Sequence, residues 1–358
     1  MPMEKYRGLI EVSPEFFGVL WKYIDDDCIT DIDYNGSELW IRDYQNHREK
    51  VRGISVSPHF IRQLTQRIAN SVSKEFNKQN PVLEAETERL RISIVHESVA
   101  VTGRSICIRK TLPMTRIKTK EAIQGGYISK EGLAFLRNAV KAHMNMVICG
   151  EPGVGKTEFA KFISQSIPNQ ERVITIEDNL EWHYHKIKPL ADCVEMQVSE
   201  IFSYRDAIIT SLRQNPKWLM VSEVRGEEVV SYLQQLTTGV NGITTLHTDD
   251  ARKVPSRLVN MASEHIGKDR METDIYSFLD IAVLISIRID EYGKEKRFID
   301  QICFFYQEAE QKKHLLLCDN GKVTKEHIPC ELTLKFKKAG ITKIFENEEV
   351  ERETEGRF

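Results

Sequence analysis

The stretch that decides the fold is residues 144–167, which read MNMVICGEPGVGKTEFAKFISQSI. A short apolar run, 146–149, is typical of a buried strand and leads into a glycine-rich turn. In that turn Gly150, four further residues, and Gly155-Lys156-Thr157 match the G-x-x-x-x-G-K-[ST] spacing of a P-loop. The apolar residues that follow recur at helical spacing: Phe159, Ala160, Phe162, Ile163 and Ile167. Strand, turn and helix are the context that the motif requires, so a chance match is the weaker interpretation.

Each residue type in the motif has a physical role. The glycines at 150, 153 and 155 let the backbone turn successive N–H groups inward around a phosphate chain. Lys156 supplies a positive charge for the β- and γ-phosphates, Thr157 offers a hydroxyl to Mg²⁺, and the helix adds the positive end of its dipole. We therefore predict that ATP and Mg²⁺ are the cofactors. The predicted nucleotide-binding residues are Gly150, Glu151, Pro152, Gly153, Val154, Gly155, Lys156, Thr157 and Glu158.

Length, charge and cysteine usage exclude several classes of protein. The 358 residues favour two domains or slightly more. Lys and Arg total 50 against 53 Asp and Glu, a net charge of -3, which disfavours DNA binding as the main task. No apolar window approaches the ~18 residues of a membrane span, and the first residues lack a signal-peptide core, so we expect a cytosolic protein. The seven cysteines form no C-x-x-C pair, which argues against a zinc ribbon or a disulfide framework.

Residues 1–110 are predicted to form a smaller α+β domain. Serine followed by proline at 13–14 and 57–58 indicates two helix starts, and Asn35-Gly36 between apolar runs indicates a hairpin. Further strands are expected near residues 90–94 and 106–108. The polar, basic segment 111–120 is interpreted as a linker.

From residue 121 to about 310 the pattern alternates strand and helix, as a mostly parallel α/β sheet requires. The expected strands are 146–149, 173–176, 218–221 and 243–246, with helices near 206–214, 226–237 and 250–262. Two hairpins are expected later, at 281–306 and 315–323. Residues 311–358 are predicted to be a C-terminal extension, and from 347 to 357 we expect disorder or a solvated helix end.

Polar residues follow each expected strand of this domain, where a doubly wound sheet holds its ligands. Glu177, Asp178 and Glu181 are predicted to hold Mg²⁺, directly or through water, or to polarise an attacking water. Glu223 is predicted to be the catalytic base or water-positioning residue, because Ser222 occupies the usual place of a metal-binding Asp. His247 offers an imidazole that can report phosphate state. The alternatives are a solvated acidic turn for the first group and a structural histidine for His247.

Four sequence blocks together resemble one family: GEPGVGKT, TIEDNLEW, LRQNP followed by MVSEVRGEE, and TTGVNGITTLHTDDA. In this order they are similar to the P-loop ATPases of type II and type IV secretion and type IV pilus systems. EVRG and PSRLVNM are closest to the tight-adherence (Flp pilus) and conjugation-type branch. The resemblance covers roughly residues 25–305.

The resemblance implies a RecA-like domain in a hexameric ring, with nucleotide bound between that domain and the N-terminal one. It implies that Glu177, Asp178 and Glu181 form an acidic box, with Asp178 and Glu181 joining Thr157 around the metal. It also implies an atypical Walker B element at Glu223 and a His box ending at His247. Four arginines match basic residues that the family places in or near its nucleotide site: Arg104, Arg109, Arg213 and Arg225. Val240, Ser222 and Lys217 depart from the family's usual residues.

The leading hypothesis is an ATPase motor that drives secretion, pilus assembly or conjugative transfer. Its expected partners are further copies of the chain and an integral membrane platform protein, at the inner face of the cell membrane. The alternatives are a nucleotide-dependent scaffold with weak hydrolysis and a RecA-like DNA translocase. Lys156, Thr157 and Glu223 together weigh against the scaffold, and the acidic pI weighs against the translocase and against a direct nucleic-acid partner.

Overall fold

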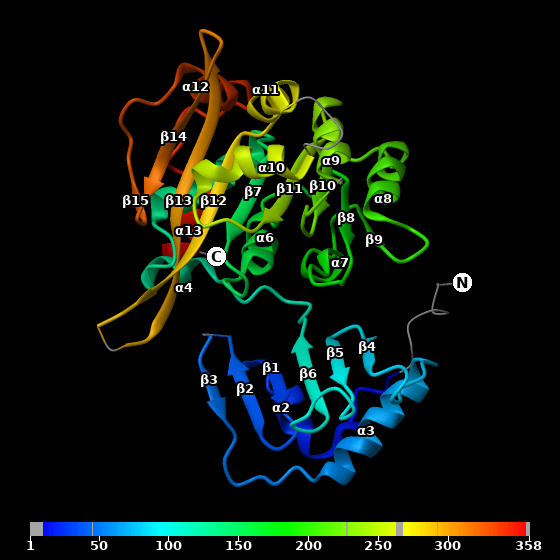
Figure 1. Ribbon diagram of the computed structural model, residues 1–358. Coiled ribbons are helices and arrows are strands. Elements are labelled where there is room, and N and C mark those ends of the chain that lie inside the picture. The colour runs from blue at the N-terminus through cyan, green and yellow to red at the C-terminus, as the bar shows by residue number, and fades with distance from the viewer. Residues whose placement is uncertain (1–9, 45, 227, 263–267, 292, 356–358) are drawn as a thin grey trace. The chain divides into compact units, whose positions relative to one another are not determined.

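The computed structural model describes residues 10–44, 46–226, 228–262, 268–291 and 293–355, and the chain divides into two units, Met1–Leu112 and Pro113–Phe358 (Figure 1). Each unit has its own sheet and its own apolar core. The domain prediction placed residues 111–120 in a linker; helix α4 (Thr119–Gln124) already begins within that range.

The first unit is an antiparallel sheet with helices packed on it. Its six strands lie in the order β3-β2-β1-β6-β5-β4, and every neighbouring pair is antiparallel. The strands are β1 (Ile29–Tyr34), β2 (Leu39–Asp43), β3 (Arg48–Lys50), β4 (Val82–Glu86), β5 (Leu90–Val95) and β6 (Ser105–Lys110). Alternate residues of β5 are buried and pack with Leu64 and Ile68 of helix α3 (Pro58–Ser71).

The two predicted helix starts are confirmed by their capping bonds. The N–H of Phe16 donates to Ser13 Oγ (3.3 Å), and the N–H of Phe60 donates to Ser57 Oγ (3.1 Å). The first helix is not continuous, however. It is divided into α1 (Pro14–Phe17), a 3₁₀ turn η1 (Gly18–Leu20) and α2 (Trp21–Asp25), because Gly18 takes a positive φ of 50° that ends the first turn.

The second unit contains a nine-stranded sheet of order β15-β14-β13-β12-β7-β11-β10-β8-β9. From β12 to β9 the neighbouring strands run parallel, and β13, β14 and β15 extend the sheet antiparallel. The strands are β7 (Met146–Gly150), β8 (Val173–Glu177), β9 (Cys193–Gln197), β10 (Trp218–Val221), β11 (Asn241–Leu246), β12 (Ile281–Ile289), β13 (Glu295–Glu308), β14 (Gln311–Asp319) and β15 (Lys322–Val323). The predicted fold class, an α/β domain with a mostly parallel sheet after a smaller α+β domain, is confirmed.

Helices cover both faces of this sheet (Figure 1). They are α4, α5 (Lys130–Lys141), α6 (Lys156–Ser164), α7 (Tyr184–Ile187), α8 (Tyr204–Ser211), η2 (Leu212–Gln214), α9 (Glu228–Thr237), η3 (Ala251–Lys253), α10 (Val254–Ala262), α11 (Lys268–Phe278), α12 (Cys330–Lys338) and α13 (Glu348–Glu355). In β7, Met146 and Ile148 pack on one core and Val147 and Cys149 on the other. Burial on both faces explains why the parallel strands are continuous apolar runs in the sequence.

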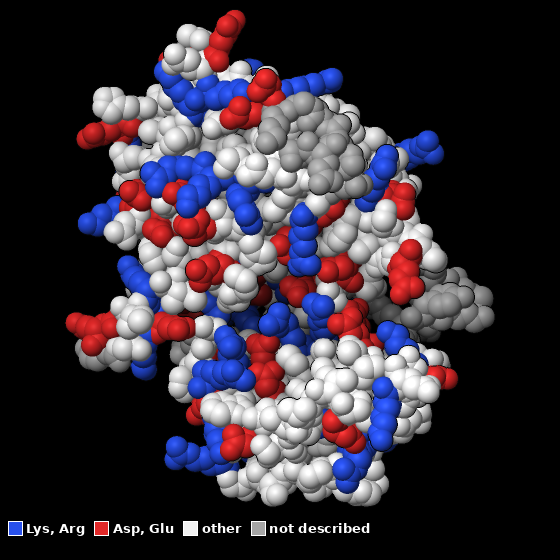
Figure 2. All heavy atoms as spheres, viewed as in Figure 1, with Lys and Arg blue, Asp and Glu red and all other residues white. Residues whose placement is uncertain are grey.

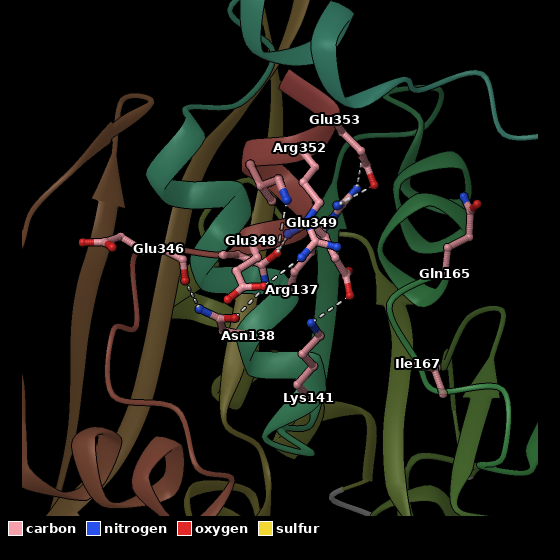
Figure 3. Close-up of polar contacts among 12 residues, drawn as sticks. Arg137, Asn138, Lys141, Gln165, Ile167, Glu346, Glu348, Glu349, Arg352 and Glu353 are labelled. Carbon is pink, nitrogen blue, oxygen red and sulfur yellow. Dashed lines mark hydrogen bonds and ion pairs between the residues drawn. The ribbon is translucent and has the colours of Figure 1, made fainter. Parts of the chain in front are cut away.

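The region for which we expected an extension with a partly disordered tail is largely ordered in the second unit. β14 pairs with β13, Leu332 and Phe336 of α12 are buried, and so is Val350 of α13. Arg137 of α5 forms two bonds to the Glu353 carboxylate, at 3.0 and 2.8 Å (Figure 3). Of the two alternatives expected for residues 347–357, the structure shows a largely solvent-exposed helix end over Glu348–Glu355. Its order depends on partners in α5 that the local composition does not reveal.

Candidate active site

The P-loop joins β7 to α6 with the backbone conformation that its glycines predict. Gly150, Gly153 and Gly155 have φ values of 147°, 81° and 95°. A Cβ on Gly150 would lie 2.5 Å from the carbonyl oxygen of Ile285, so that position also lacks space for a side chain. At Gly153 and Gly155 no atom lies within 4 Å of the position that a Cβ would take, so there the backbone conformation alone requires glycine.

The first turn of α6 has no side-chain cap, in contrast to α5 and α8. Its N-cap is Gly155, whereas α5 and α8 begin with Ser129 and Ser203, whose hydroxyls accept from backbone N–H groups. An uncapped helix start leaves N–H donors for an external acceptor. A phosphate group fits that position in charge and in hydrogen-bonding capacity.

Lys156 is held at the inside of this turn. Its Nζ donates to the carbonyl oxygens of Gly150 (3.1 Å) and Glu151 (3.0 Å) and lies 3.0 Å from His247 Nδ1. The side chain is buried, and burial lowers the pKa of Lys156 to about 8, while the charge of Glu223 opposes the shift. An ammonium held mainly by neutral acceptors is poised to exchange them for an anion.

Glu223 and His247 extend this cluster along the neighbouring strands. His247 follows β11, Glu223 follows β10, and His247 Nε2 lies 3.1 Å from Glu223 Oε1. His247 Nδ1 lies 3.0 Å from Lys156 Nζ and 3.3 Å from the carbonyl oxygen of Gly150. In the tautomer that accepts from the Lys156 ammonium at Nδ1, the ring proton is on Nε2 and faces Glu223. The other carboxylate oxygen, Glu223 Oε2, accepts from the largely exposed Arg225. Three strand ends thus contribute to one chain of polar contacts.

Glu177, at the end of β8, is a fully buried carboxyl group. Its Oε1 accepts from the N–H groups of Glu181 and Trp182, both at 3.1 Å, whereas Oε2 has no partner among the described residues. Burial raises the pKa of Glu177 to about 8 despite those two bonds. A buried oxygen without a partner is costly, and such costs concentrate at functional sites.

The residues predicted to hold the metal fit magnesium in donor chemistry. Among the described residues no three His, Cys, Asp or Glu side chains form a ready metal site. Magnesium does not require one, because it keeps several waters and uses few protein oxygens together with substrate phosphates. Thr157 is half-buried in the first turn of α6, and Asp178 and Glu181 are half-buried after β8. These three residues would hold Mg²⁺ or its waters.

Residues 32–354 match the family model described as type II/IV secretion system protein. The chain belongs to the type II/IV secretion system protein family. An uncharacterised protein of Bacillus anthracis is 31% identical over 270 residues, covering 74% of this chain and 60% of that protein. A putative conjugal transfer protein of Mycobacterium tuberculosis is 25% identical over 292 residues, covering 78% of this chain and 82% of that protein.

The chain spans about three fifths of the length of the Bacillus anthracis relative. Among solved structures, the ATPase DotB of Yersinia pseudotuberculosis is similar with a TM-score of 0.61 over 99% of this chain and 89% of that one. At 16% identity this similarity shows the fold alone. It confirms the RecA-like assignment of the second unit of this secretion-family chain.

Not every predicted arginine lies at the P-loop end of the sheet. Arg213 lies in η2, before the start of β10, and the next residue, Gln214, accepts from Arg172, which precedes β8. Because β7, β8 and β10 are parallel, this is the end of the sheet opposite the P-loop. Arg213 is therefore distant from the P-loop of its own chain, and its expected role at a nucleotide site stays a prediction. A cavity of 540 Å³ at that end is lined by Arg172 and Lys217 among others, away from the site described above.

The two N-terminal arginines are bound within the first unit. Arg104 contacts Glu97 (2.6 Å) and Thr65 (2.5 Å), and Arg109 contacts Asp31 (2.9 Å). Their proposed contact with phosphate requires these bonds to be exchanged, and it stays a prediction.

Sequence reasoning missed two residues that contact the site. Tyr204 of α8 accepts from the N–H of Asp178 (3.0 Å) and shares a bond with Ser222 Oγ (2.7 Å), which gives the serine at the usual aspartate position a structural partner. Arg297 of β13 donates to the carbonyl oxygen of Gly153 at 3.0 Å. No local signal identifies either one, because both lie far along the chain from their partners.

Proposed function

We propose that this chain is a Mg²⁺-dependent ATP hydrolase whose catalytic residues follow β7, β11 and β10. The observation that carries the proposal is the continuous contact Lys156–His247–Glu223 beside an uncapped P-loop. It combines a phosphate-binding cation, a carboxylate and an imidazole between them.

The residues take distinct roles in this proposal. P-loop N–H groups and Lys156 bind the β- and γ-phosphates. Mg²⁺, when bound, would screen the charge of these phosphates. Glu223 orients the attacking water and accepts its proton, because it is the carboxylate in contact with His247 and Arg225. His247 links Lys156 to Glu223, so a shift of the ammonium toward phosphate is felt at the carboxylate. Glu177 contributes a protonated carboxyl group at neutral pH.

The finer function that we propose is a hexameric motor that powers secretion, pilus assembly or conjugative transfer. Family membership supports the secretion role, and the name of the Mycobacterium tuberculosis relative supports the conjugation branch. Arg104, Arg109 and Arg225 are proposed to add positive charge around the γ-phosphate, from this chain or from a neighbouring copy.

The proposed partner is a membrane platform protein rather than nucleic acid. None of the described helices is long and apolar enough to cross a bilayer, so we propose peripheral attachment at the cytoplasmic face through that partner. Lysine and arginine side chains are interspersed with aspartate and glutamate over the face in Figure 2. Interspersed charge does not favour a phosphate backbone as the main ligand.

Phosphate release from ATP, with and without Mg²⁺, tests the proposed function. We expect turnover that requires Mg²⁺ and that single-stranded DNA does not stimulate. Light scattering with a non-hydrolysable ATP analogue is expected to show a species several times the 41.4 kDa chain. Failure to bind ATP at any Mg²⁺ concentration would contradict the proposal that the chain is an ATP hydrolase. Full turnover by a monomer would contradict the proposal of a hexameric ring.

A further inference from the structure

The apex of the P-loop is held by a residue from outside the parallel part of the sheet. Arg297 lies near the start of β13, where it pairs with Ile287 of β12. Its Nη2 donates to the carbonyl oxygen of Gly153 at 3.0 Å. With β13 and β12 on one side of β7 and β11 and β10 on the other, Arg297 approaches the loop from the side opposite His247 and Glu223.

This bond has a defined effect on the N–H groups of the P-loop because a peptide unit is planar. The Gly153 carbonyl and the Val154 N–H belong to the same unit and point in opposite directions. Holding the carbonyl toward Arg297 therefore aims the Val154 N–H away from it. That N–H has only a 3.5 Å contact with the carbonyl oxygen of Glu151, at the outer limit of a hydrogen bond, so it is available to a stronger acceptor.

The loop needs such a restraint at this position. Gly153 is exposed, has a φ of 81°, and has no atoms within 4 Å of the position that a Cβ would take. Glycine moves readily between conformations, so its carbonyl is not fixed by its own backbone. β13 is a firm support, because Ile299, two residues after Arg297, donates its N–H to the carbonyl oxygen of Tyr127 at 2.7 Å.

We propose that Arg297 is a positioning residue that keeps the P-loop in its phosphate-binding shape by fixing the Gly153–Val154 peptide. It contacts neither the reacting atoms nor the nucleoside. This inference rests on the proposed nucleotide site and adds to it a residue that determines affinity. Its action is the same for any ligand whose phosphates enter the loop.

The test compares Arg297→Ala and Arg297→Lys with Arg288→Ala in the whole chain. Arg288, on β12, lies 4.7 Å over the Phe298 ring and is the matched control, because it removes an arginine from the same hairpin. Binding of ADP and of pyrophosphate, each with Mg²⁺, is measured by calorimetry, and ATP turnover gives KM and kcat. Thermal melting without ligand reports whether each variant folds.

We expect Arg297→Ala to weaken the binding of ADP and of pyrophosphate to a similar extent, about tenfold. It should raise KM for ATP and leave kcat within about threefold of the wild-type value. Arg297→Lys, which retains a positively charged donor group, should recover part of the affinity, and Arg288→Ala should bind both ligands as the wild type does. Weaker ADP binding with unchanged pyrophosphate binding overturns the proposal, because it would mean that Arg297 contacts the nucleoside rather than supporting the phosphate-binding loop. Unchanged affinity for both ligands also overturns it. A wild-type chain that binds neither ligand instead overturns the nucleotide site itself.

Discussion

Two clusters of charged and polar side chains in the second unit differ in whether opposite charges pair directly. Each contains one buried side-chain atom without a hydrogen-bond partner among the described residues, Arg137 Nε in one and Glu177 Oε2 in the other. Where α5 meets α13, Arg137 bonds both oxygens of Glu353 (Figure 3). The Asn347 amide donates to Asn138 Oδ1 at 2.7 Å. At the P-loop, by contrast, Lys156 relies on two carbonyls and an imidazole.

The difference supports the proposal that the P-loop cluster serves chemistry and the α5–α13 cluster serves structure. In the α5–α13 cluster opposite charges pair directly. Burial acts to raise the pKa of Glu353, but its bonds with Arg137 and Thr119 outweigh burial and lower it. At the P-loop, burial moves the pKa of Lys156 down and that of Glu177 up, each to about 8. Groups that are buried without full compensation have exchangeable partners, and a bound phosphate or water can supply the missing ones.

The largest expected effect comes from removing the cation of the P-loop. Lys156→Ala is predicted to reduce ATP turnover at least a thousandfold, because it deletes the only P-loop side chain that places a charge on the phosphates. Phosphate release measures the effect. Lys217→Ala, an exposed lysine at the opposite end of the sheet, should stay within twofold. Turnover of Lys156→Ala within about tenfold of the wild type would remove this cluster from the mechanism.

Glu223→Gln is predicted to slow hydrolysis roughly a hundredfold while ATP still binds, because the amide keeps the volume but accepts no proton. Single-turnover phosphate release and equilibrium ATP binding separate the two effects. Asp249→Asn, an exposed carboxylate two residues after His247, is the control. A collapse of affinity with unchanged chemistry would make Glu223 a binding residue instead.

Glu177 should give the protein a pH-dependent stability. The folded chain keeps a proton on Glu177 up to a pKa of about 8, whereas the unfolded chain loses it near 4.5. The unfolding free energy therefore falls as pH rises between these values, by up to about 1.4 kcal/mol per pH unit. Urea unfolding at pH 6 and pH 8 should show this loss in the wild type and a smaller one in Glu177→Gln. The same change in unfolding free energy between pH 6 and pH 8 in both proteins would show that the Glu177 carboxyl group is ionised in the folded chain.

The smallest effect on turnover is expected in the α5–α13 cluster. Glu353→Gln is predicted to lower the unfolding free energy by about 1–3 kcal/mol, because it leaves the buried Arg137 charge poorly paired. ATP turnover should stay within twofold. Glu348→Gln, whose partner Arg352 is exposed, should cost less than about 0.5 kcal/mol. A large loss of turnover in Glu353→Gln without loss of stability would break the division between the two clusters.

The sequence predicts the P-loop cluster far better than the α5–α13 cluster. The P-loop is recognisable because its residues are contiguous and each type has one physical role, and Glu223 and His247 follow apolar runs that indicate strands. The partners Arg137 and Glu353 are 216 residues apart, and nothing in either local pattern refers to the other. Composition alone therefore left disorder and a solvated helix end as alternatives, and tertiary contacts stabilise the helix.

The position of Arg213 illustrates a different limit. Its motif places it near the Walker B strand in the sequence, but α8 runs back along the sheet before η2, so the residue lies at the other end. Proximity in sequence to a site residue does not determine which end of a strand a side chain occupies. Arg297 is the converse case, because it is distant in sequence and contacts the P-loop directly.

The most direct test of the central claim is a structure of the chain with Mg²⁺ and a non-hydrolysable ATP analogue. We expect the β- and γ-phosphates to lie against the N–H groups of the P-loop and Lys156 Nζ to leave His247 Nδ1 for a phosphate oxygen. We also expect Glu223 to face the γ-phosphate. An analogue bound elsewhere, or one bound at the P-loop while Lys156 keeps its contact with His247, would contradict the claim that this cluster is an ATP-hydrolysing site.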